Sequence, residues 1–495
     1  MKTAPSKNVL FLVVDSLMSH AIDQGIKEGR LPALSFLIQH GQYHKELVSS
    51  FPTMSITIDS TLLTGTYTDR HRVPGLIWYD RDEGRVINYG TGFREIIRDG
   101  INRTLQDLVS HLNQKHLNPE TPTLYEELAR LGIRSGSING MVYRGNTDHE
   151  LRFPIWLAGL TSLPRKLKVK GPDFLAYGAF SSPLKGLPDS IINDLGFSDK
   201  YPLAVTRFLV KENRLPAFLY VYFSDMDKPI HKKGPSYMGG LYKFDRELQS
   251  LLDSFGSWEQ ALEKVTWIIC GDSGQTATLP PEKDPVIPLH KLLKGYQRLQ
   301  PGKKTTPDTE LVLCVNARMA YIYALKPTVR IPDLVTDLKE EPRIDLLSWR
   351  EEEWIHVLHV GRNKQLKYRP GKTWTDPYNQ KWEIQGEMEA LGITADPRGK
   401  RLAFGEYPDP LSRLAGAHFS HSGRFLVVTA GPGYELVADH SPTHQGGGGH
   451  GSLHQTDSLV PLIITGTNLR PNHSRIVDLK AFLIDLLTEH TSPGQ

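Results

Sequence analysis

The stretch NVLFLVV at residues 8–14 decides the fold, and Asp15 and Ser16 follow it directly. A continuous run of aliphatic and β-branched residues is typical of a strand that is buried on both faces, as in a parallel sheet. Four more runs of this kind lie further along the chain, at 217–223, 265–271, 425–430 and 459–465. Helical patterns separate them, such as 238–255, where apolar residues recur every three or four positions. This alternation predicts an α/β fold with a mostly parallel central sheet flanked by helices.

The segment 276–410 has a different character. It is rich in proline, lysine and glutamate, and it contains two tryptophan-bearing stretches, EEEWIHVLHVG and KTWTDPYNQKWEI. Linkers seldom contain so many tryptophans and β-branched residues, which makes a simple linker the less favoured alternative. We therefore expect residues 276–410 to form an inserted, smaller α+β cap with short antiparallel strands that covers the functional site. Residues 1–275 and 411–495 would then form the core.

Composition and charge limit the classes of partner. Lys+Arg total 58 and Asp+Glu total 55, so the net charge is +3, and neither nucleic acid nor an anionic membrane is expected to bind. The hydrophobic content of 39% excludes a disordered chain. The composition therefore predicts a folded chain that can bury a sizeable core.

Two further features bear on the compartment. The two cysteines, Cys270 and Cys314, lie in apolar runs, which predicts buried free thiols of the kind found in a reducing compartment. The first apolar run, 9–14, is shorter than the roughly 7–15 residues of a signal peptide core, and no run reaches the ~18 residues of a membrane span. We therefore expect a cytoplasmic protein without a membrane partner.

Acidic residues follow three of the predicted strands, in VVDS, VYFSDMD and ICGDSG. Because the carboxyl ends of parallel strands meet at the same edge of a sheet, we expect Asp15, Asp227 and Asp272 to converge there. An aspartate after a strand is also a common helix cap, so each of the three has a purely structural interpretation as well.

Histidines add further metal-ligand types. Asp227 and His231 are spaced i, i+4, and a carboxylate oxygen and an imidazole nitrogen both suit Zn²⁺ or Mn²⁺. In HQGGGGHGSLHQTDSLVP the glycines permit close backbone approach. Four histidines fall within 15 residues here, which is a density that suggests metal binding: His440, His444, His450 and His454. A solvated or flexible loop is the alternative for either segment.

The stretch SSFPTMSITIDSTLLTG at residues 49–65 places Ser55 at the start of a predicted helix. A serine there is usually an N-cap. The same position also puts a hydroxyl where the helix dipole and the unpaired amides favour a phosphate. From this segment alone, Ser55 is either a cap or a nucleophile.

Taken in order, these motifs resemble the alkaline phosphatase superfamily, and more narrowly its type I phosphodiesterase/nucleotide pyrophosphatase branch. The matching pieces are FLVVDS, FPTMSITIDSTLLTGTYTDRHRVPG, YFSDMDKPIHKKGP, CGDSGQT and GGHGSL with VPLIITG, and they span nearly the whole chain.

The resemblance implies a site with two metal ions. One metal would be held by Asp227, His231 and His450, and the other by Asp15, Asp272 and the Ser55 oxygen. Ser55 would be the nucleophile, where the branch usually has threonine, and would form a phosphoryl-enzyme intermediate that water then cleaves.

The sequence departs from the branch at the second metal. The usual Asp-His-Gly is Asp272-Ser273-Gly274 here, so this metal would meet the hydroxyl of Ser273 instead of an imidazole. A hydroxyl is a weaker and harder ligand, which favours Mg²⁺, Mn²⁺ or Ca²⁺ over Zn²⁺ or leaves the site loosely bound. His454 is a candidate substitute.

A second departure concerns the phosphate. The branch often carries a phosphate-binding asparagine where this chain has Leu76. Asn139 is a candidate replacement, and Arg144 and Lys228 are further candidates for substrate binding. A turn asparagine and two surface charges are the alternative interpretation.

We therefore expect a metal-dependent hydrolase of phosphate esters that acts on a small phosphorylated substrate, with a phosphodiester or nucleotide pyrophosphate favoured over a monoester. The expected cofactors are two divalent ions, Zn²⁺ or Mn²⁺, with Mg²⁺ or Ca²⁺ also suited to the Asp15/Asp272 site. Two alternatives stay open. One is phosphoryl transfer, as in the phosphoglycerate mutases that need no cofactor, and the other is a non-catalytic binding protein with a degraded metal site.

Overall fold

The computed structural model describes residues 7–90, 103–160, 163–182, 184–300, 302–439 and 441–489. Its central sheet has seven strands in the order β2-β24-β10-β1-β9-β5-β8. Their bounds are β1 (Asn8–Val14), β2 (Gly41–Val48), β5 (Ser135–Ile138), β8 (Phe174–Ala176), β9 (Phe218–Phe223), β10 (Val265–Gly271) and β24 (Leu459–Thr465). Strand β1 pairs in parallel with β9 and β10, and within this sheet only β24 runs antiparallel to its neighbours. The predicted mostly parallel α/β sheet is confirmed.

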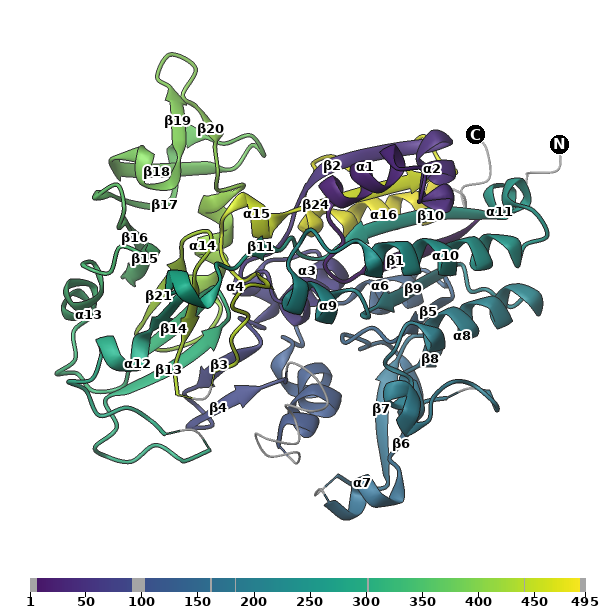
Figure 1. The fold of residues 1–495 in the computed structure, drawn as a ribbon, viewed down its shortest axis with the longest axis horizontal. Coiled ribbons are helices and arrows are strands. Elements are labelled where there is room, and N and C mark those ends of the chain that lie inside the picture. The colour runs from purple at the N-terminus through teal and green to yellow at the C-terminus, as the bar shows by residue number, and fades with distance from the viewer. Residues whose placement is uncertain are drawn as a thin grey trace.

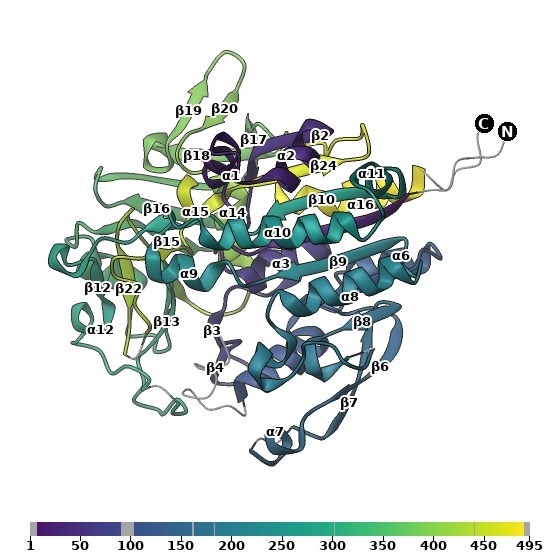
Figure 2. The ribbon, with the colours of Figure 1, turned by 45° about the vertical axis from the view of Figure 1, so that its right-hand side comes forward.

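Helices cover both faces of this sheet because its central strand is apolar on both sides. Val9, Phe11 and Val13 enter one hydrophobic core, and the alternate residues of β1 enter another. The first core is covered by α3 (Ser55–Thr64), α6 (Leu124–Arg130) and α16 (Leu479–Glu489). The second is covered by α1 (Ser19–Lys27), α2 (Pro32–Gln39), α8 (Lys200–Lys211), α10 (Gly239–Asp253) and α11 (Trp258–Lys264) (Figures 1 and 2).

A second, nine-stranded sheet lies beside the end of the central sheet where α3 and α9 (Asp227–Lys233) are found (Figure 1). It is antiparallel except for the β17–β20 pair. Its strands are β13 (Leu311–Asn316), β14 (Met319–Ala324), β15 (Ile344–Glu351), β16 (Trp354–His359), β17 (Lys364–Thr375), β18 (Lys381–Gly386), β19 (Ile393–Asp396), β20 (Arg401–Phe404) and β21 (Phe425–Ala430). The helices α12 (Leu289–Leu292), α13 (Ile331–Leu338) and α14 (Pro410–Phe419) accompany it.

The boundary expected at residue 410 does not coincide with the limit of this sheet. Strand β21, which we expected in the core, pairs with β14 and β15 in the second sheet. It is buried along its whole length, so its sequence has the same apolar character as a strand of the central sheet. Strand β22 (Glu435–Val437) also belongs on this side, since it pairs with β12 (Val286–Pro288).

Two very short strands form a separate ladder of two residue pairs. Strand β11 (Thr276–Ala277) pairs antiparallel with β23 (Gly448–Gly449), with Thr276 opposite Gly449. The ladder thereby fixes the segment after Asp272 against the segment before His450. An added Cβ at Gly447 would lie 1.9 Å from the His231 carbonyl oxygen, so this approach requires glycine.

Other segments complete the fold. Two hairpins, β3 (Ile77–Asp80) with β4 (Arg85–Asn88) and β6 (Thr147–Arg152) with β7 (Lys166–Gly171), extend from the central sheet, and α4 (Thr68–His71) follows α3. Both cysteines are free and buried, as predicted. None of the helices in the described part of the chain has the length and apolar character that crossing a bilayer requires.

Candidate metal centre

Three aspartates meet at the carboxyl edge of the central sheet, next to its middle strands. Val14 is in register with Phe223 on one side and Gly271 on the other, so Asp15 and Asp272 leave the sheet side by side and α9 starts nearby with Asp227. Two of these carboxylates, those of Asp272 and Asp227, are linked through one residue, Ser16. Its N–H donates to Asp272 Oδ1 at 2.9 Å, and its hydroxyl donates to Asp227 Oδ1 at 2.8 Å. The predicted convergence is therefore present.

Ser16 holds this position in an unfavourable backbone conformation. It is fully buried and its φ is 60°, in the left-handed region that non-glycine residues rarely adopt. That conformation costs a residue with a Cβ roughly 1–2 kcal/mol. Its hydrogen bonds to two carboxylates offset the cost, which explains a serine where glycine would be unstrained.

The first group of candidate ligands consists of Asp227, His231 and His450. Asp227 Oδ1 lies 3.1 Å from His231 Nε2 and 3.9 Å from His450 Nε2, and one ligand atom from each of the three lies within 4.8 Å of the others. The i, i+4 spacing on α9 brings Asp227 and His231 together. The β11–β23 ladder positions His450 beside them.

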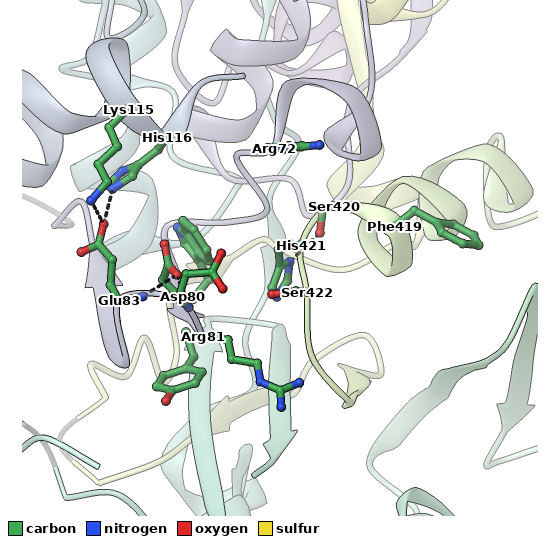
Figure 3. A pocket seen from close by; sticks show the side chains of 13 residues that line it. Arg72, Asp80, Arg81, Glu83, Lys115, His116, Phe419, Ser420, His421 and Ser422 are labelled. Atoms are coloured by element: carbon green, nitrogen blue, oxygen red, sulfur yellow. Dashed lines mark hydrogen bonds and ion pairs between the residues drawn. The ribbon is translucent and has the colours of Figure 1, made fainter. Parts of the chain in front are cut away.

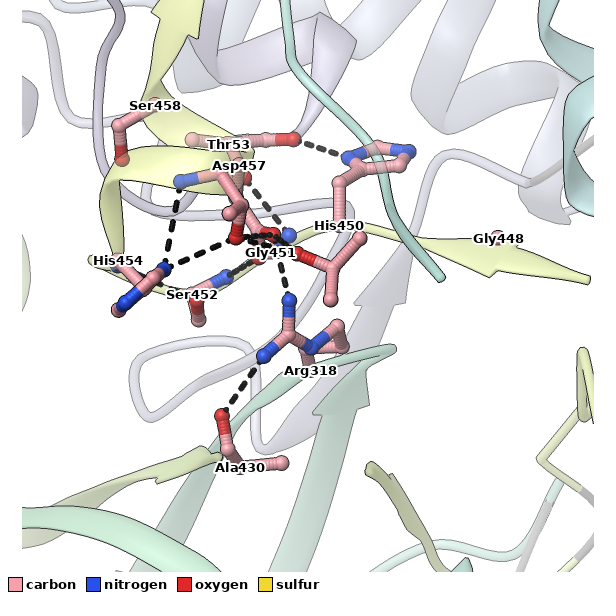
Figure 4. A network of polar contacts seen from close by, with 12 residues as sticks. Thr53, Arg318, Ala430, Gly448, His450, Gly451, Ser452, His454, Asp457 and Ser458 are labelled. Carbon is pink, nitrogen blue, oxygen red and sulfur yellow. Dashed lines mark hydrogen bonds and ion pairs between the residues drawn. The ribbon is translucent and has the colours of Figure 1, made fainter. Parts of the chain in front are cut away.

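The hydrogen bonds made by the Nδ1 atoms of both imidazoles support a ligand role for the Nε2 atoms. His231 Nδ1 donates to the Gly448 carbonyl at 2.7 Å, and His450 Nδ1 donates to the Thr53 carbonyl (Figure 4). A carbonyl only accepts, so Nδ1 carries the hydrogen and Nε2 is left for a cation, which is the usual arrangement around metal-binding histidines. The residues present therefore fit a divalent cation here.

The other histidines of the same tract have different partners. His444 stacks on His231 with ring centroids 4.2 Å apart and faces Glu435. His454 caps the short helix α15 (Gln455–Ser458) through its side chain and packs against Tyr407, so it does not replace the imidazole absent at Ser273. His440 lies outside the described residues.

Charge coupling sets the protonation of the first group. Burial opposes ionisation of Asp227, but the imidazoles of His231 and His450 hold its pKa below the ordinary value. Burial alone would lower the pKa of His231, and the Asp227 carboxylate overcomes this effect and raises it to about 9. Without a cation, His231 is thus an imidazolium paired with Asp227.

The second group is formed by oxygen atoms. Burial raises the pKa of Asp15 well above its ordinary value, and the charges of Asp272 and Asp227 raise it further. Tyr222 on β9 donates to Asp15 Oδ2 at 2.8 Å and lies 3.3 Å from Asp272 Oδ2. The Ser273 hydroxyl is fully buried and has no hydrogen-bond partner within the described ranges. Two adjacent buried carboxyls fit a hard divalent cation, and the role of the Ser273 hydroxyl as a further ligand stays a prediction.

Ser55 occupies the first position of α3 and does not cap it. The N-cap residue is Met54, which lacks a side-chain cap, and a cis Phe51–Pro52 bond precedes it. Burial raises the pKa of Asp272, and the Ser16 N–H, the charge of His450 and the nearby Ser55 hydroxyl oppose this increase. The Ser55 hydroxyl is therefore next to the second group of ligands.

Three further residues were predicted to bind the substrate: Asn139, Arg144 and Lys228. The Asn139 amide donates to the Gly196 carbonyl and accepts from the Gly178 N–H. The Arg144 guanidinium binds the carbonyls of Leu117, Asn118 and Thr121, where it holds a loop together. Lys228 is exposed and adjacent to Asp227 in the chain. The roles of these three residues in substrate binding stay predictions.

We expect a divalent cation to release protons when it binds near pH 7. The cation takes the His231 Nε2 position that a proton occupies below about pH 9. Affinity should therefore decrease as pH falls. Calorimetric titration with Mn²⁺ in buffers of different ionisation enthalpy should give about one proton released from the first position at saturation. Release close to zero would contradict this charge assignment.

A buried ion pair holds the segment that carries His450. Arg318, between β13 and β14, contacts Asp457 at 2.5 Å, and both side chains are fully buried. Asp457 also accepts from the Ser452 N–H and the Thr276 hydroxyl, and the Arg318 N–H donates to the His450 carbonyl (Figure 4). The second sheet is thereby tied to the loop that carries His450.

A second group that could hold a metal lies away from this centre. Asp107, His111 and His116 offer ligand atoms within 4.8 Å of one another. However, the Arg85 guanidinium binds both oxygens of Asp107 at 2.7 and 2.8 Å. The carboxylate is already neutralised, so a cation is not favoured there.

The same region contains a pocket of about 560 Å³ beside the β3–β4 hairpin. Trp78 and His421 contribute to its wall, and Lys115 and His116 approach Glu83 at its side (Figure 3). None of the residues that line it belongs to the metal centre.

Comparisons with known proteins agree with the fold. A family model described as type I phosphodiesterase / nucleotide pyrophosphatase matches residues 9–453. A search of curated proteins finds no match. Murine ectonucleotide pyrophosphatase/phosphodiesterase 5 superposes with a TM-score of 0.57 at 13% identity, covering 99% of this chain and 97% of that chain. The human protein gives 0.57 at 14% identity, covering 97% and 95%. An inactive variant of the murine protein in complex with AMP gives 0.56 at 12% identity, covering 99% and 97%.

Proposed function

Because the chain belongs to the type I phosphodiesterase/nucleotide pyrophosphatase family of the alkaline phosphatase superfamily, we propose that it is a metal-dependent hydrolase of phosphodiester or nucleotide pyrophosphate bonds. One observation carries the proposal. Two groups of cation ligands, joined through Ser16, lie beside a serine hydroxyl at the start of a helix. This combination supports phosphate chemistry with Ser55 as the nucleophile.

The residues around the centre have distinct tasks. Asp227, His231 and His450 would hold one cation, and Asp15, Asp272, Ser55 and Ser273 would hold the other. When bound, two divalent cations lower the pKa of a coordinated hydroxyl and neutralise phosphate charge. Tyr222 keeps Asp15 and Asp272 oriented through its hydroxyl.

Ser55 would carry the covalent step. Its hydroxyl loses its proton to solvent, the oxygen attacks phosphorus, and the ester or anhydride oxygen leaves with the electron pair of the broken P–O bond. The phosphoryl-enzyme intermediate is then an ester of Ser55 that keeps the other substituent of the diester. A water molecule attacks the same phosphorus and gives up a proton, and the Ser55 oxygen leaves and is protonated again. The N-terminus of α3 favours the negative phosphate throughout, because the helix dipole and its first N–H groups point toward it.

The substrate we propose is a small nucleotide-like phosphodiester or pyrophosphate. Family membership supports the bond type, and the AMP bound to the murine relative supports a nucleotide. Hydrolysis of bis-nitrophenyl phosphate and of nitrophenyl phosphate, each with Mn²⁺ or Zn²⁺ added, tests the choice. Diester turnover is expected to be faster than monoester turnover. If neither compound is hydrolysed, the proposal is defeated.

The division of the chain forms part of the proposal. The central sheet would supply the chemistry, and the region of the second sheet would act as a cap that sets specificity. Two free cysteines in buried positions support a reducing compartment such as the cytoplasm.

The two cation positions should differ in metal preference. The first has two imidazole nitrogens and suits Zn²⁺, whereas the second has oxygen ligands and suits Mg²⁺ or Mn²⁺. We expect Ser273→His to raise the Zn²⁺ affinity of the second position by about 10–100-fold and to weaken its Mg²⁺ binding. Competition titration against a zinc indicator and metal analysis after dialysis measure this shift.

Ser273→Ala is the matched control, since it removes the hydroxyl without adding nitrogen. It should bind all divalent ions more weakly at the second position and should not shift the preference toward Zn²⁺. An unchanged preference in Ser273→His, with the protein folded, would show that residue 273 does not face the cation.

A further inference from the structure

Gln275 places a side-chain amide inside the metal centre. It lies three residues after Asp272 and directly before the ladder strand β11. Its Nε2 donates to Asp227 Oδ1 and to Ser16 Oγ, both at 2.9 Å. The residue is 4% exposed, and its Oε1 is buried with no hydrogen-bond partner in the part of the chain that the structure describes. The amide is therefore only half satisfied.

Asp227 Oδ1 is approached by more hydrogen-bond donors than its lone pairs can accept once a cation binds. His231, Ser16 and Gln275 all approach this one oxygen, at 3.1, 2.8 and 2.9 Å. A carboxylate oxygen has about two lone-pair sites, and a cation takes one of them. The cation also replaces the proton on His231 Nε2. One lone pair then remains for two donors, Ser16 and Gln275.

Of these two donors, Ser16 is the one that stays. Its backbone N–H is bonded to Asp272, and its left-handed conformation fixes the hydroxyl. Gln275 has a longer and more flexible side chain, and its free Oε1 does not anchor it. Its N–H group is thus released within reach of the centre when the cation binds. The nearest new acceptor there is an oxygen of a phosphate bound at the cations.

We propose that Gln275 donates an N–H to a non-bridging oxygen of the phosphate during the reaction. This inference rests on the proposed function, because it concerns the phosphate at that same centre. Charge develops on the equatorial oxygens of a transferring phosphoryl group, and a buried donor that reaches one of them stabilises the transition state. Asn139, the amide considered from sequence, is occupied by backbone groups instead.

The competing interpretation is that Gln275 only positions Asp227. The two interpretations differ in which ligand loses affinity when the amide is removed. A phosphate donor affects the anion at saturating metal, whereas a positioning residue affects the metal itself. Orthovanadate serves as the anion because it reproduces the five-coordinate geometry of phosphoryl transfer, and Mn²⁺ alone serves as the metal.

The experiment compares the full-length wild type with Gln275→Ala and Gln275→Glu. Gln24→Ala is the matched control, because it removes an exposed glutamine amide on α1 whose hydrogen bond in the described part of the chain goes to Glu28. For each protein, Mn²⁺ affinity is measured by calorimetry, the orthovanadate inhibition constant at saturating Mn²⁺ by inhibition of diester turnover, and kcat and KM separately. Gln275→Glu is nearly isosteric and keeps the test valid if the alanine variant does not fold.

We expect kcat to fall by about 10²-fold or more in both Gln275 variants, as for other single donors to a developing oxyanion. Vanadate inhibition at saturating Mn²⁺ should weaken in parallel, while Mn²⁺ affinity of Gln275→Ala changes less than twofold. Weaker Mn²⁺ binding with unchanged vanadate inhibition would overturn the inference, and so would unchanged kcat. If the wild type hydrolyses no phosphate ester, the proposed function fails, and direct calorimetry of vanadate binding to the Mn²⁺-loaded proteins still decides the role of Gln275.

Discussion

We expect Ser55→Ala to lower kcat by a factor on the order of 10⁴ or more, while the cation proposed to be held by Asp227, His231 and His450 is retained. The reason is that, in the proposed function, the Ser55 oxygen is the atom that becomes covalently bonded to phosphorus. Steady-state kinetics on a diester, together with metal analysis of the same preparation, measure both parts of the result.

Two further variants on α3 serve as controls for this result. Ser55→Thr keeps a hydroxyl at the same position and should keep turnover within about tenfold. Ser60→Ala removes a buried hydroxyl that bonds only the Ile56 carbonyl of its own helix, and it should leave kcat unchanged. Turnover by Ser55→Ala at the wild-type rate would rule out the serine as nucleophile.

The second large effect is on stability. Arg318→Met is expected to lower the free energy of unfolding by about 3–5 kcal/mol, because it leaves the Asp457 carboxylate buried without its counter-charge. The methionine fills much of the volume but cannot replace the bonds from the guanidinium to Asp457 and to the Ala430 carbonyl. Urea unfolding followed by circular dichroism measures the loss.

The matched control is Arg330→Met. Arg330 also pairs with an aspartate, Asp333, at 2.6 Å, but the two side chains are 71% and 42% exposed. An exposed pair contributes only about 0–1 kcal/mol, so this variant should unfold close to the wild type. Equal losses in the two variants would show that burial of the Arg318–Asp457 pair does not control stability.

Arg318→Met should also weaken cation binding at the first position. The Arg318 backbone bonds the His450 carbonyl, and Asp457 fixes the loop through the Ser452 N–H. When the loop loosens, His450 loses its fixed orientation toward Asp227. A decrease in Mn²⁺ affinity at temperatures well below unfolding separates this local effect from global destabilisation.

The positions of the central ligands could be predicted because topology alone determines them. Parallel strands bring Asp15 and Asp272 to one edge whatever surrounds them, and the i, i+4 spacing of Asp227 and His231 needs only one helical turn. His450 depended on matching a motif, because the ladder that delivers it consists of two residue pairs and has no detectable sequence pattern.

Other features could not be predicted, each for a physical reason. Strand β21 is apolar on both faces, and both sheets contain such strands, so hydrophobicity does not say which sheet receives it. Ser16 and Gln275 matter through partners far away in sequence, and their own segments resemble ordinary turns. Arg144 looked like a free cation, but its partners are backbone carbonyls, which a sequence pattern does not reveal.

The β11–β23 ladder bears on the order in which parts of the protein unfold on heating. Asp15 and Asp272 directly follow strands of the central sheet, whereas His450 directly follows β23. If β23 separates from β11 before the central sheet unfolds, the His450 imidazole leaves the centre while these two carboxylates stay in place. Thermal inactivation would then begin before the bulk of the molecule loses its secondary structure.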